Sequence, residues 1–183
     1  MAMAGRYNQA VIRPLPNSLL ILFGLPGAGK SFVGQVLRQD FGYFFHEADE
    51  DIPEDYRRLV AAGHVVDEAR RDAYHQHLLD RLEELCARQP RLAVAVPLLR
   101  DRHRRRILEC FPQAIFILVQ CQPARWQARL AGRTHTVGLD YARKIASLYE
   151  PPSVPHRVLD DSPDGPLEVR RRLAELLGTP VGN

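Results

Sequence analysis

Residues 24–31 read Gly-Leu-Pro-Gly-Ala-Gly-Lys-Ser, which fits the pattern G-x-x-x-x-G-K-[ST] of a phosphate-binding loop. The run before it, Ser18–Phe23, is short and apolar, as in a buried strand. The stretch after it, Phe32–Asp40, carries apolar residues at helical spacing. Strand, glycine-rich turn and helix follow in the order that the motif needs. We therefore expect a P-loop near the start of an α/β domain.

The chemistry of this loop predicts a nucleoside triphosphate as ligand. Glycines let backbone N–H groups turn inward around the β-phosphate, and the helix N-terminus adds a partial positive charge. Lys30 is predicted to reach the β/γ-phosphate oxygens, and the Ser31 hydroxyl to bind Mg²⁺. The alternative, a glycine turn before an ordinary helix, explains less of the pattern. The predicted cofactors are ATP and Mg²⁺, and the predicted nucleotide-binding residues of the loop are Gly24, Pro26, Gly27, Ala28, Gly29, Lys30, Ser31 and Phe32.

Composition places the chain among soluble globular proteins. Its 183 residues suit one domain, and 45% apolar with 26% charged residues is an ordinary balance. No apolar run approaches the roughly 18 residues of a membrane span. The three cysteines have no metal-ligand spacing, and their odd number disfavours a disulfide framework. We expect a cytoplasmic protein without a membrane partner, and a homodimer is kept open as a common arrangement.

Apolar runs alternate with helical patterns along the chain. Such alternation predicts right-handed crossovers and a three-layer α/β/α sandwich around a five-stranded parallel sheet, of the P-loop NTPase or nucleoside-monophosphate-kinase type. We expect an arm at 1–17, one domain at 18–178 and a tail at 179–183. The expected strands are Leu19–Phe23, Tyr43–Phe45, Leu92–Val96, Ala114–Val119 and Arg157–Leu159. The expected helices are Phe32–Gln39, Glu54–Ala62, Asp67–Arg88, Asp101–Cys110, Pro123–Gly132, Leu139–Tyr149 and Pro166–Leu177.

The basic residues are unusual because all of the 25 except Lys30 and Lys144 are arginine. Their densest group lies in residues 100–106, which also include His103. Such a group can contact nucleic acid, but a solvated helix face beside a phosphate site is the favoured interpretation. Nucleic acid is therefore disfavoured as a partner.

An acidic segment, residues 46–53, follows the second expected strand. Ligands of open α/β sheets bind beyond the carboxyl ends of the strands, where an aspartate can hold Mg²⁺ or accept a proton from an attacking hydroxyl. Asp49, Glu47 and Asp51 are the candidates for both roles. The alternative is an acidic start for the helix at Glu54, favoured by the helix dipole.

The ends of the later strands suggest further site residues. The third strand has no carboxylate directly after it, which disfavours motor-type ATPases, and Arg100 beyond it can face an anionic acceptor or start a helix. After the fourth strand, an arginine such as Arg129 can stack on adenine. Arg133, which follows a glycine, can close over the transferring phosphate and stabilise its developing charge. The alternative for each arginine is a solvated helix surface.

Three segments, Gly24–Ser31, Asp49–Pro53 and Arg129–His135, together resemble the gluconokinase branch of small P-loop sugar kinases, which is close to shikimate kinase. The likeness continues at Gly63 and at Arg71–Tyr74, which resembles the Arg-x-x-Trp of that family. It implies an ATP-dependent transfer of phosphate to a hydroxyl of a small molecule, with Lys30, Asp49 and Arg133 as catalytic residues and a lid near residues 133–138. It selects Asp49 over Glu47 and Asp51, because Asp49 falls at the aspartate of the family's Gly-Asp-x-x-His-Pro stretch. It also implies Asp49, Arg71 and His135 as substrate contacts, and the place of Arg100 after the third strand adds that residue.

The sequence departs from the family where the acceptor binds. The family's His before Pro is Ile52, and two polar residues of the next helix are Tyr56 and Leu59. The Cys-Ser-Ala-Leu-Lys segment after the third strand is Ala95–Leu99. We therefore expect a kinase of a different, less polar hydroxyl compound. Two rivals remain open: a non-catalytic or regulatory ATP-binding protein, and a kinase of nucleic-acid ends.

Overall fold

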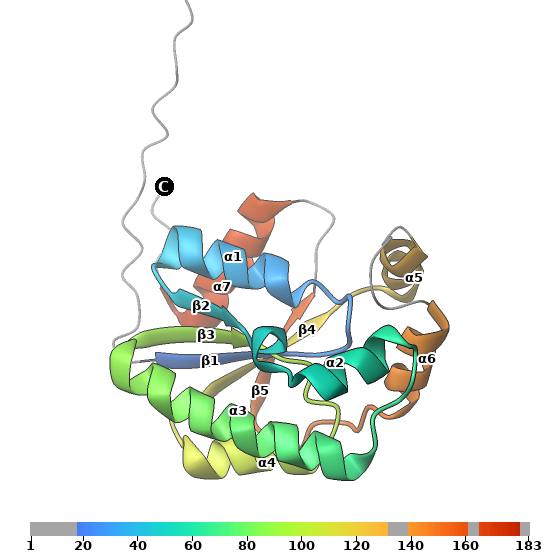
Figure 1. Ribbon diagram of the computed structural model, residues 1–183. Coiled ribbons are helices and arrows are strands. Elements are labelled where there is room, and N and C mark those ends of the chain that lie inside the picture. Colours follow the sequence, from blue (N-terminus) through green and yellow to red (C-terminus); the bar gives the residue numbers. More distant parts are fainter. Residues whose placement is uncertain (1–17, 132–138, 161–164, 180–183) are drawn as a thin grey trace, which may run out of the picture.

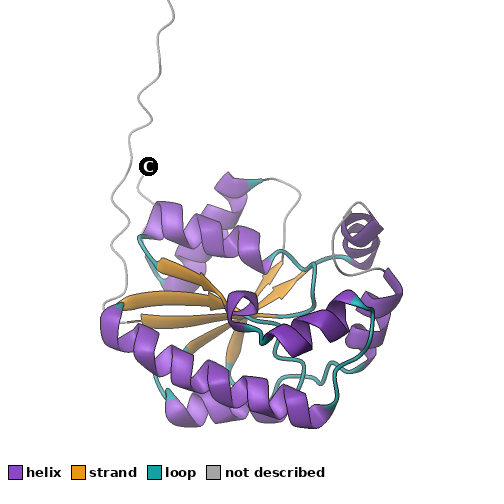
Figure 2. Ribbon diagram, viewed as in Figure 1, coloured by secondary structure: helices purple, strands orange, loops and turns teal. Residues whose placement is uncertain are grey.

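The computed structural model of the protein describes residues 18–131, 139–160 and 165–179. Its parallel sheet has the order β2-β3-β1-β4-β5, and Figures 1 and 2 show helices on both of its faces. The predicted three-layer α/β fold with five parallel strands is confirmed. The strands are β1 (Ser18–Phe23), β2 (Phe44–Glu47), β3 (Arg91–Ala95), β4 (Ile115–Gln120) and β5 (His156–Asp160). The helices are α1 (Lys30–Phe41), α2 (Glu54–Ala61), α3 (Glu68–Arg88), α4 (Asp101–Cys110), α5 (Pro123–Ala131), α6 (Leu139–Ser147) and α7 (Pro166–Leu177).

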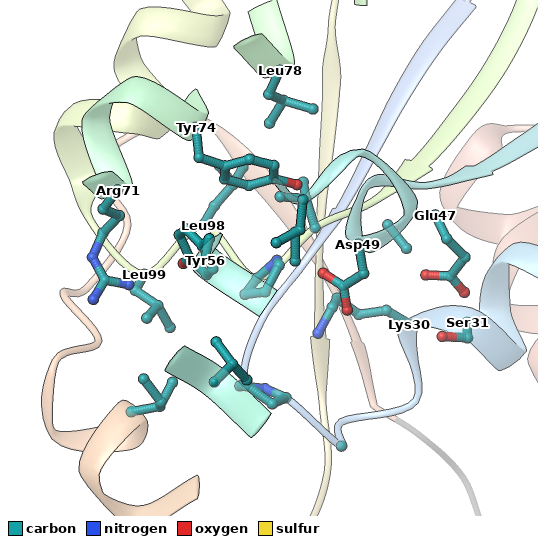
Figure 3. Close-up of a pocket in the computed structure, with 18 of the residues that line it drawn as sticks. Lys30, Ser31, Glu47, Asp49, Tyr56, Arg71, Tyr74, Leu78, Leu98 and Leu99 are labelled. Carbon is teal, nitrogen blue, oxygen red and sulfur yellow. The ribbon is translucent and has the colours of Figure 1, made fainter. Parts of the chain in front are cut away.

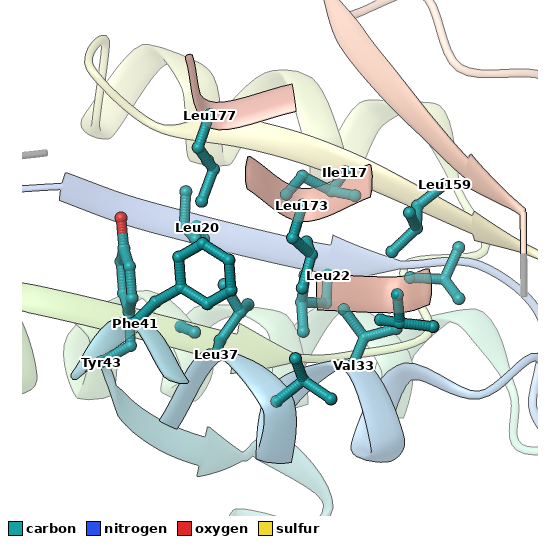
Figure 4. Close-up of a cluster of buried hydrophobic side chains, with 14 of the residues drawn as sticks. Leu20, Leu22, Val33, Leu37, Phe41, Tyr43, Ile117, Leu159, Leu173 and Leu177 are labelled. Atoms are coloured by element: carbon teal, nitrogen blue, oxygen red, sulfur yellow. The ribbon is translucent and has the colours of Figure 1, made fainter. Parts of the chain in front are cut away.

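The core divides into two layers because β1 alternates its side chains between the two faces of the sheet. Leu20 and Leu22 join a cluster with residues of α1 and α7, which Figure 4 shows against the sheet. Leu19, Ile21 and Phe23 join the opposite cluster with residues of α3 and α4. Every residue of β1 is buried, which fits a central strand covered on both faces.

Several helix ends have the chemistry that their sequences indicate. The Asp67 side chain caps α3 by accepting a hydrogen bond of 2.8 Å from the Arg70 backbone N–H. Gly178 ends α7 in the left-handed conformation, with φ of 65°. The second strand differs from expectation, because it spans Phe44–Glu47 rather than Tyr43–Phe45. Glu47 thus ends the strand, and the acidic segment becomes a 3₁₀ turn at Ala48–Asp51.

Gly34 in α1 lies directly against the ring of Phe45 in β2. A Cβ atom at Gly34 would stand 2.0 Å from that ring, far inside van der Waals contact. We expect Gly34→Ala to destabilise the fold by about 1–2 kcal/mol, because forced overpacking outweighs the gain in helix propensity. Urea unfolding measures this change. In a Phe45→Ala background the sign should reverse, since the clash is gone and alanine is the better helix former; destabilisation in that background would contradict the explanation.

The topology places the loops after β1, β2 and β3 at one edge of the sheet, beyond the carboxyl ends of these strands. The turn after β3 also touches the turn after β1, since the Gly24 N–H donates to the Pro97 carbonyl at 3.4 Å. Among the described residues, no helix is long and apolar enough to cross a membrane. This edge holds the candidate site.

Candidate active site

The loop after β1 has the backbone that its glycines were expected to supply. Gly24, Gly27 and Gly29 have φ values of 134°, 84° and 104°, a region that residues with a Cβ rarely adopt. At Gly24 a Cβ would also stand 2.4 Å from the Val119 carbonyl oxygen of β4. Helix α1 begins at Lys30 directly after the turn, so its first N–H groups lie at the loop.

Two side chains contact the carbonyl groups of this loop. The Lys30 ammonium donates to the carbonyls of Gly24, at 3.1 Å, and Leu25, at 3.0 Å. The Trp126 indole N–H of α5 donates to the Pro26 carbonyl at 2.8 Å. Lys30 therefore lies across the mouth of the loop, and Trp126 fixes the loop from outside.

A cavity of about 550 Å³ opens beside the loop, a volume suited to small molecules. The end of the cavity beside the loop contains most of the predicted nucleotide-binding residues and the carboxylates of Glu47 and Asp49. Figure 3 shows Lys30, Ser31, Glu47 and Asp49 close together at this end. The lining residues at this end are Pro26, Gly27, Gly29, Lys30, Ser31, Phe32, Glu47, Asp49 and Arg129.

The 3₁₀ turn separates the competing carboxylates. Asp51 accepts a hydrogen bond of 2.6 Å from His46 Nε2, and its Oδ1 lies 3.7 Å from Arg81 Nε. Asp51 is thereby held by its neighbours, whereas Asp49 and Glu47 line the cavity. Asp49 is exposed on the open side of the cavity. The surrounding walls nevertheless desolvate its carboxylate and raise its pKa, and the positive charges of Lys30 and Arg57 partly oppose this shift. Asp49 and Glu47 are therefore the two candidate bases that line the cavity.

Ser31, Asp49 and Glu47 form a donor set that fits Mg²⁺. Hydroxyl and carboxylate oxygens are the ligands that this hard cation takes in proteins, usually together with phosphates of its substrate. The Lys30 ammonium beside them suits the phosphate groups that accompany the ion. A protein site of Ser31 with one carboxylate is therefore chemically sufficient for Mg²⁺ carried by a nucleotide.

Arg71 of α3 lines the opposite end of the cavity and is only 6% exposed. Its Nη2 donates to the Val66 carbonyl at 2.9 Å, and its Nε lies 3.5 Å from a Glu68 carboxylate oxygen. That contact is too long for a good hydrogen bond, and Nε has no hydrogen-bond partner within the described parts of the chain. A buried guanidinium with donor capacity left over is suited to an anionic ligand.

Arg100 is placed differently from the expected acceptor contact. It pairs with Glu68 at 2.7 Å and with Glu150 at 3.2 Å, and it is not among the residues that line the cavity. Hydrogen bonds from Arg100 and Arg102 lower the pKa of Glu68 to about 2. These partners lie 32 and 50 positions away along the chain. In the described structure Arg100 ties α3, α4 and the segment after α6 together.

The arginine-rich segment is a solvated helix face only in part, because Arg102, Arg105 and Arg106 are exposed but Arg104 is not. Arg104 is fully buried, and its guanidinium donates to the carbonyls of Leu98 and Glu150 and lies over the ring of Phe23, 5.6 Å from the centroid. Leu98 has a φ of 44°, rare for a residue with a side chain. Arg104 thus holds the turn that forms one wall of the cavity.

Two histidines below this wall stack on each other. The rings of His75 and His103 are 4.3 Å apart and nearly parallel. His75 Nε2 donates to the His103 carbonyl at 3.0 Å, and His103 Nε2 donates to Asp72 at 2.7 Å. Burial, with a smaller effect of His103, lowers the pKa of His75 to about 4. His75 is therefore neutral in the folded protein at neutral pH.

The shift of His75 predicts how stability depends on pH. An unfolded His75 takes up its proton near pH 6.5, and the folded one only near pH 4. Its contribution is thus complete above pH 6.5 and is lost as the pH falls towards 4, up to about 3 kcal/mol. Urea unfolding at pH 7 and pH 4.5 should show that His75→Gln loses less stability than the wild type. His77→Gln, at an exposed position of the same helix, should keep the full wild-type loss; an equal loss in both variants would contradict the prediction.

The remaining predicted residues divide into two groups. Arg129 lines the cavity and its guanidinium lies 3.8 Å from Cys121 Sγ. Arg133, His135 and the expected lid at 133–138 lie outside the described residues.

The sequence did not indicate most of the residues that line the end of the cavity near Arg71. The lining there includes Tyr74, His75 and His103, together with Leu98 and Tyr141. The helical spacing of Tyr74, His75 and Leu78 marks a buried face of α3, but not the side on which a cavity opens. Ile52 and Tyr56 did indicate a less polar cavity, since both replace polar residues of the resembled family.

The parallel sheet and the glycine-rich loop after β1, with Lys30 across the mouth of that loop, define a P-loop domain. A family model described as AAA domain matches residues 19–152, and the chain belongs to this family. A search of curated proteins finds no match.

Several solved structures share the fold. An unliganded sugar kinase from Janibacter sp. HTCC2649 has a TM-score of 0.78 at 18% identity, over 89% of this chain and 95% of that one. A gluconokinase from Sinorhizobium meliloti 1021 has a TM-score of 0.73 at 23% identity, over 91% and 96%. A shikimate kinase from Bacteroides thetaiotaomicron has 0.61 at 14% identity, over 88% and 98%. The resemblance stated from the sequence is thereby confirmed at the level of fold.

Proposed function

We propose that the protein is an ATP-dependent phosphotransferase that moves the γ-phosphate of ATP to a hydroxyl group of a small molecule. The observation that carries the proposal is that Asp49 shares one cavity with Lys30 and Ser31, and that this cavity continues to Arg71, which leaves space for an acceptor. A small-molecule kinase needs such a space for its acceptor, whereas a plain nucleotide-binding domain needs only the loop. The similar folds of the sugar kinase and the gluconokinase support the same class.

In the proposed reaction, Lys30 and the loop amides hold the β- and γ-phosphates, and Ser31 and Asp49 hold Mg²⁺. Bound Mg²⁺ offsets the negative charge of the phosphate oxygens. Asp49 orients the acceptor hydroxyl and takes its proton as the new O–P bond forms and the bond to the leaving ADP breaks. Arg71 binds an anionic group of the acceptor, Arg129 contacts the adenine, and Arg133 closes over the transferring phosphate.

The test is a screen of metabolites with Mg·ATP, read by mass spectrometry for the gain of one phosphoryl group. We expect one class of hydroxyl compound to gain it in step with ADP release, and Lys30→Ala protein to form both products far more slowly. Steady ADP release without any phosphorylated acceptor would favour the regulatory alternative. A nucleic-acid substrate is less well supported, because Arg100, Arg102 and Arg104 already pair with carboxylates. Strong, salt-dependent binding of oligonucleotides would revive it.

A further inference from the structure

We propose that the acceptor has a compact hydrocarbon body, aromatic or alicyclic, between its hydroxyl and an anionic group, rather than a chain of hydroxyl groups. The inference rests on the proposed phosphotransferase function and names the class of its substrate. It comes from the lining of the cavity between Asp49 and Arg71.

The walls of this part of the cavity are aliphatic. Leu98 and Leu99 from the turn after β3 and Ile145 from α6 are each at most 5% exposed and face the cavity. Ile52 and Val60 line it from the segment after β2 and from α2. A polyol placed here would leave its water partners and meet side chains that offer no hydrogen bonds. A hydrocarbon body in the same place would be stabilised by the burial of apolar surface.

The tyrosines of the cavity add flat apolar surface and no charge, and the hydroxyl of Tyr74 is already engaged within the protein. The Tyr74 hydroxyl already donates to the Ala48 carbonyl at 2.6 Å. The Tyr56 ring lies 5.6 Å from the Tyr74 ring, tilted by 53°. Burial raises the pKa of Tyr56 and raises that of Tyr141 to about 12, so both phenols stay neutral. Aromatic faces of this kind pack well against a planar or cyclic ligand.

The histidines of the lining do not change this balance. His75 and His103 each use their Nε2 hydrogen for an acceptor within the protein. Burial lowers the pKa of both rings, so neither adds a positive charge at neutral pH. Their stacked rings are one more flat surface.

Charge is concentrated at the two ends of this space. Figure 3 shows Leu98, Leu99 and Tyr56 between Arg71 on one side and Asp49 with Lys30 on the other. An acceptor that matches this pattern has its hydroxyl at Asp49 and its anionic group at Arg71. The matching ligand is thus an apolar hydroxy acid.

The experiment measures binding apart from catalysis. Isothermal titration calorimetry on the full chain, loaded with Mg²⁺ and a non-hydrolysable ATP analogue, compares 4-(hydroxymethyl)benzoate with gluconate and with benzyl alcohol. We expect the aromatic acid to bind about 10–100-fold more tightly than gluconate, the range that apolar pockets achieve. Benzyl alcohol should bind more weakly than the aromatic acid, because it leaves Arg71 without an anion.

Variants connect the preference to the walls. Ile52→Thr and Val60→Thr place a hydroxyl at partly exposed lining positions, and each should weaken binding of the aromatic acid several-fold and narrow its advantage over gluconate. Val65→Thr is the matched control, because Val65 is 41% exposed and lies outside the lining. The proposal would be overturned if gluconate bound as tightly as the aromatic acid or if the aromatic acid did not bind. It would also be overturned if all three variants had equal effects on binding.

The same samples with Mg·ATP separate this inference from the proposed function. Phosphorylation of gluconate but not of the aromatic acid would leave the kinase function standing and refute the acceptor class. Tight binding of the aromatic acid without phosphate transfer would support the acceptor class and count against the kinase function.

Discussion

Lys30→Ala should lower the rate of phosphoryl transfer by about 10²–10⁴-fold, the scale for the loss of one preorganised charge contact. Lys30 lines the cavity and its ammonium lies within 3.1 Å of two loop carbonyls, at the position where the β- and γ-phosphates of a nucleotide would bind. The loss should appear in the formation of both ADP and phosphorylated acceptor. Stopped assays with each acceptor found in the screen measure it.

The chain offers a matched control, because Lys144 on α6 is its other lysine and is exposed. Lys144→Ala should keep the wild-type rate. Circular dichroism melting of both variants checks that the fold is intact. A folded Lys30→Ala protein that turns over at the wild-type rate would remove the loop from the reaction and with it the assignment of the site.

The order of the elements could be predicted from the sequence because the fold depends on local periodicity. Leu19–Phe23 is apolar without a break, and that pattern is typical of a strand buried on both faces, as β1 is. The P-loop glycines were also predictable, since positive φ at Gly27 and Gly29 is a local demand of the backbone. Nothing distant is needed to form either feature.

The end of the cavity near Arg71 was less predictable, because contacts between residues far apart along the chain form it. Arg100 has the same local signature whether it contacts a substrate or pairs with Glu68 and Glu150, and only the fold brings these carboxylates to it. Leu98 adopts a positive φ that leucine does not signal, held through the buried Arg104. Where the chain breaks a local rule, tertiary contacts supply the reason.

Asp49→Asn should lower kcat by about 10²–10⁴-fold, the usual contribution of a positioned general base. The change keeps the shape of the side chain but removes its negative charge and its ability to take a proton. The cavity walls raise the pKa of Asp49, whereas Mg²⁺ at its carboxylate opposes that shift. The wild-type rate should therefore fall as the pH is lowered through the range in which this carboxyl takes up its proton. The variant should lose this acid limb. Rates measured from pH 4 to pH 8 test both points.

Two neighbours in the acidic segment make the test specific. Asp51→Asn should keep kcat within a few-fold, because Asp51 is held by His46 away from the cavity. Glu47→Gln probes the competitor that does line the cavity beside Ser31. If Glu47→Gln abolished transfer and the acid limb while Asp49→Asn retained both, the base would be Glu47. If only Asp49→Asn lost activity and the acid limb, the base would be Asp49, and proton transfer would take place at the 3₁₀ turn rather than at the end of β2.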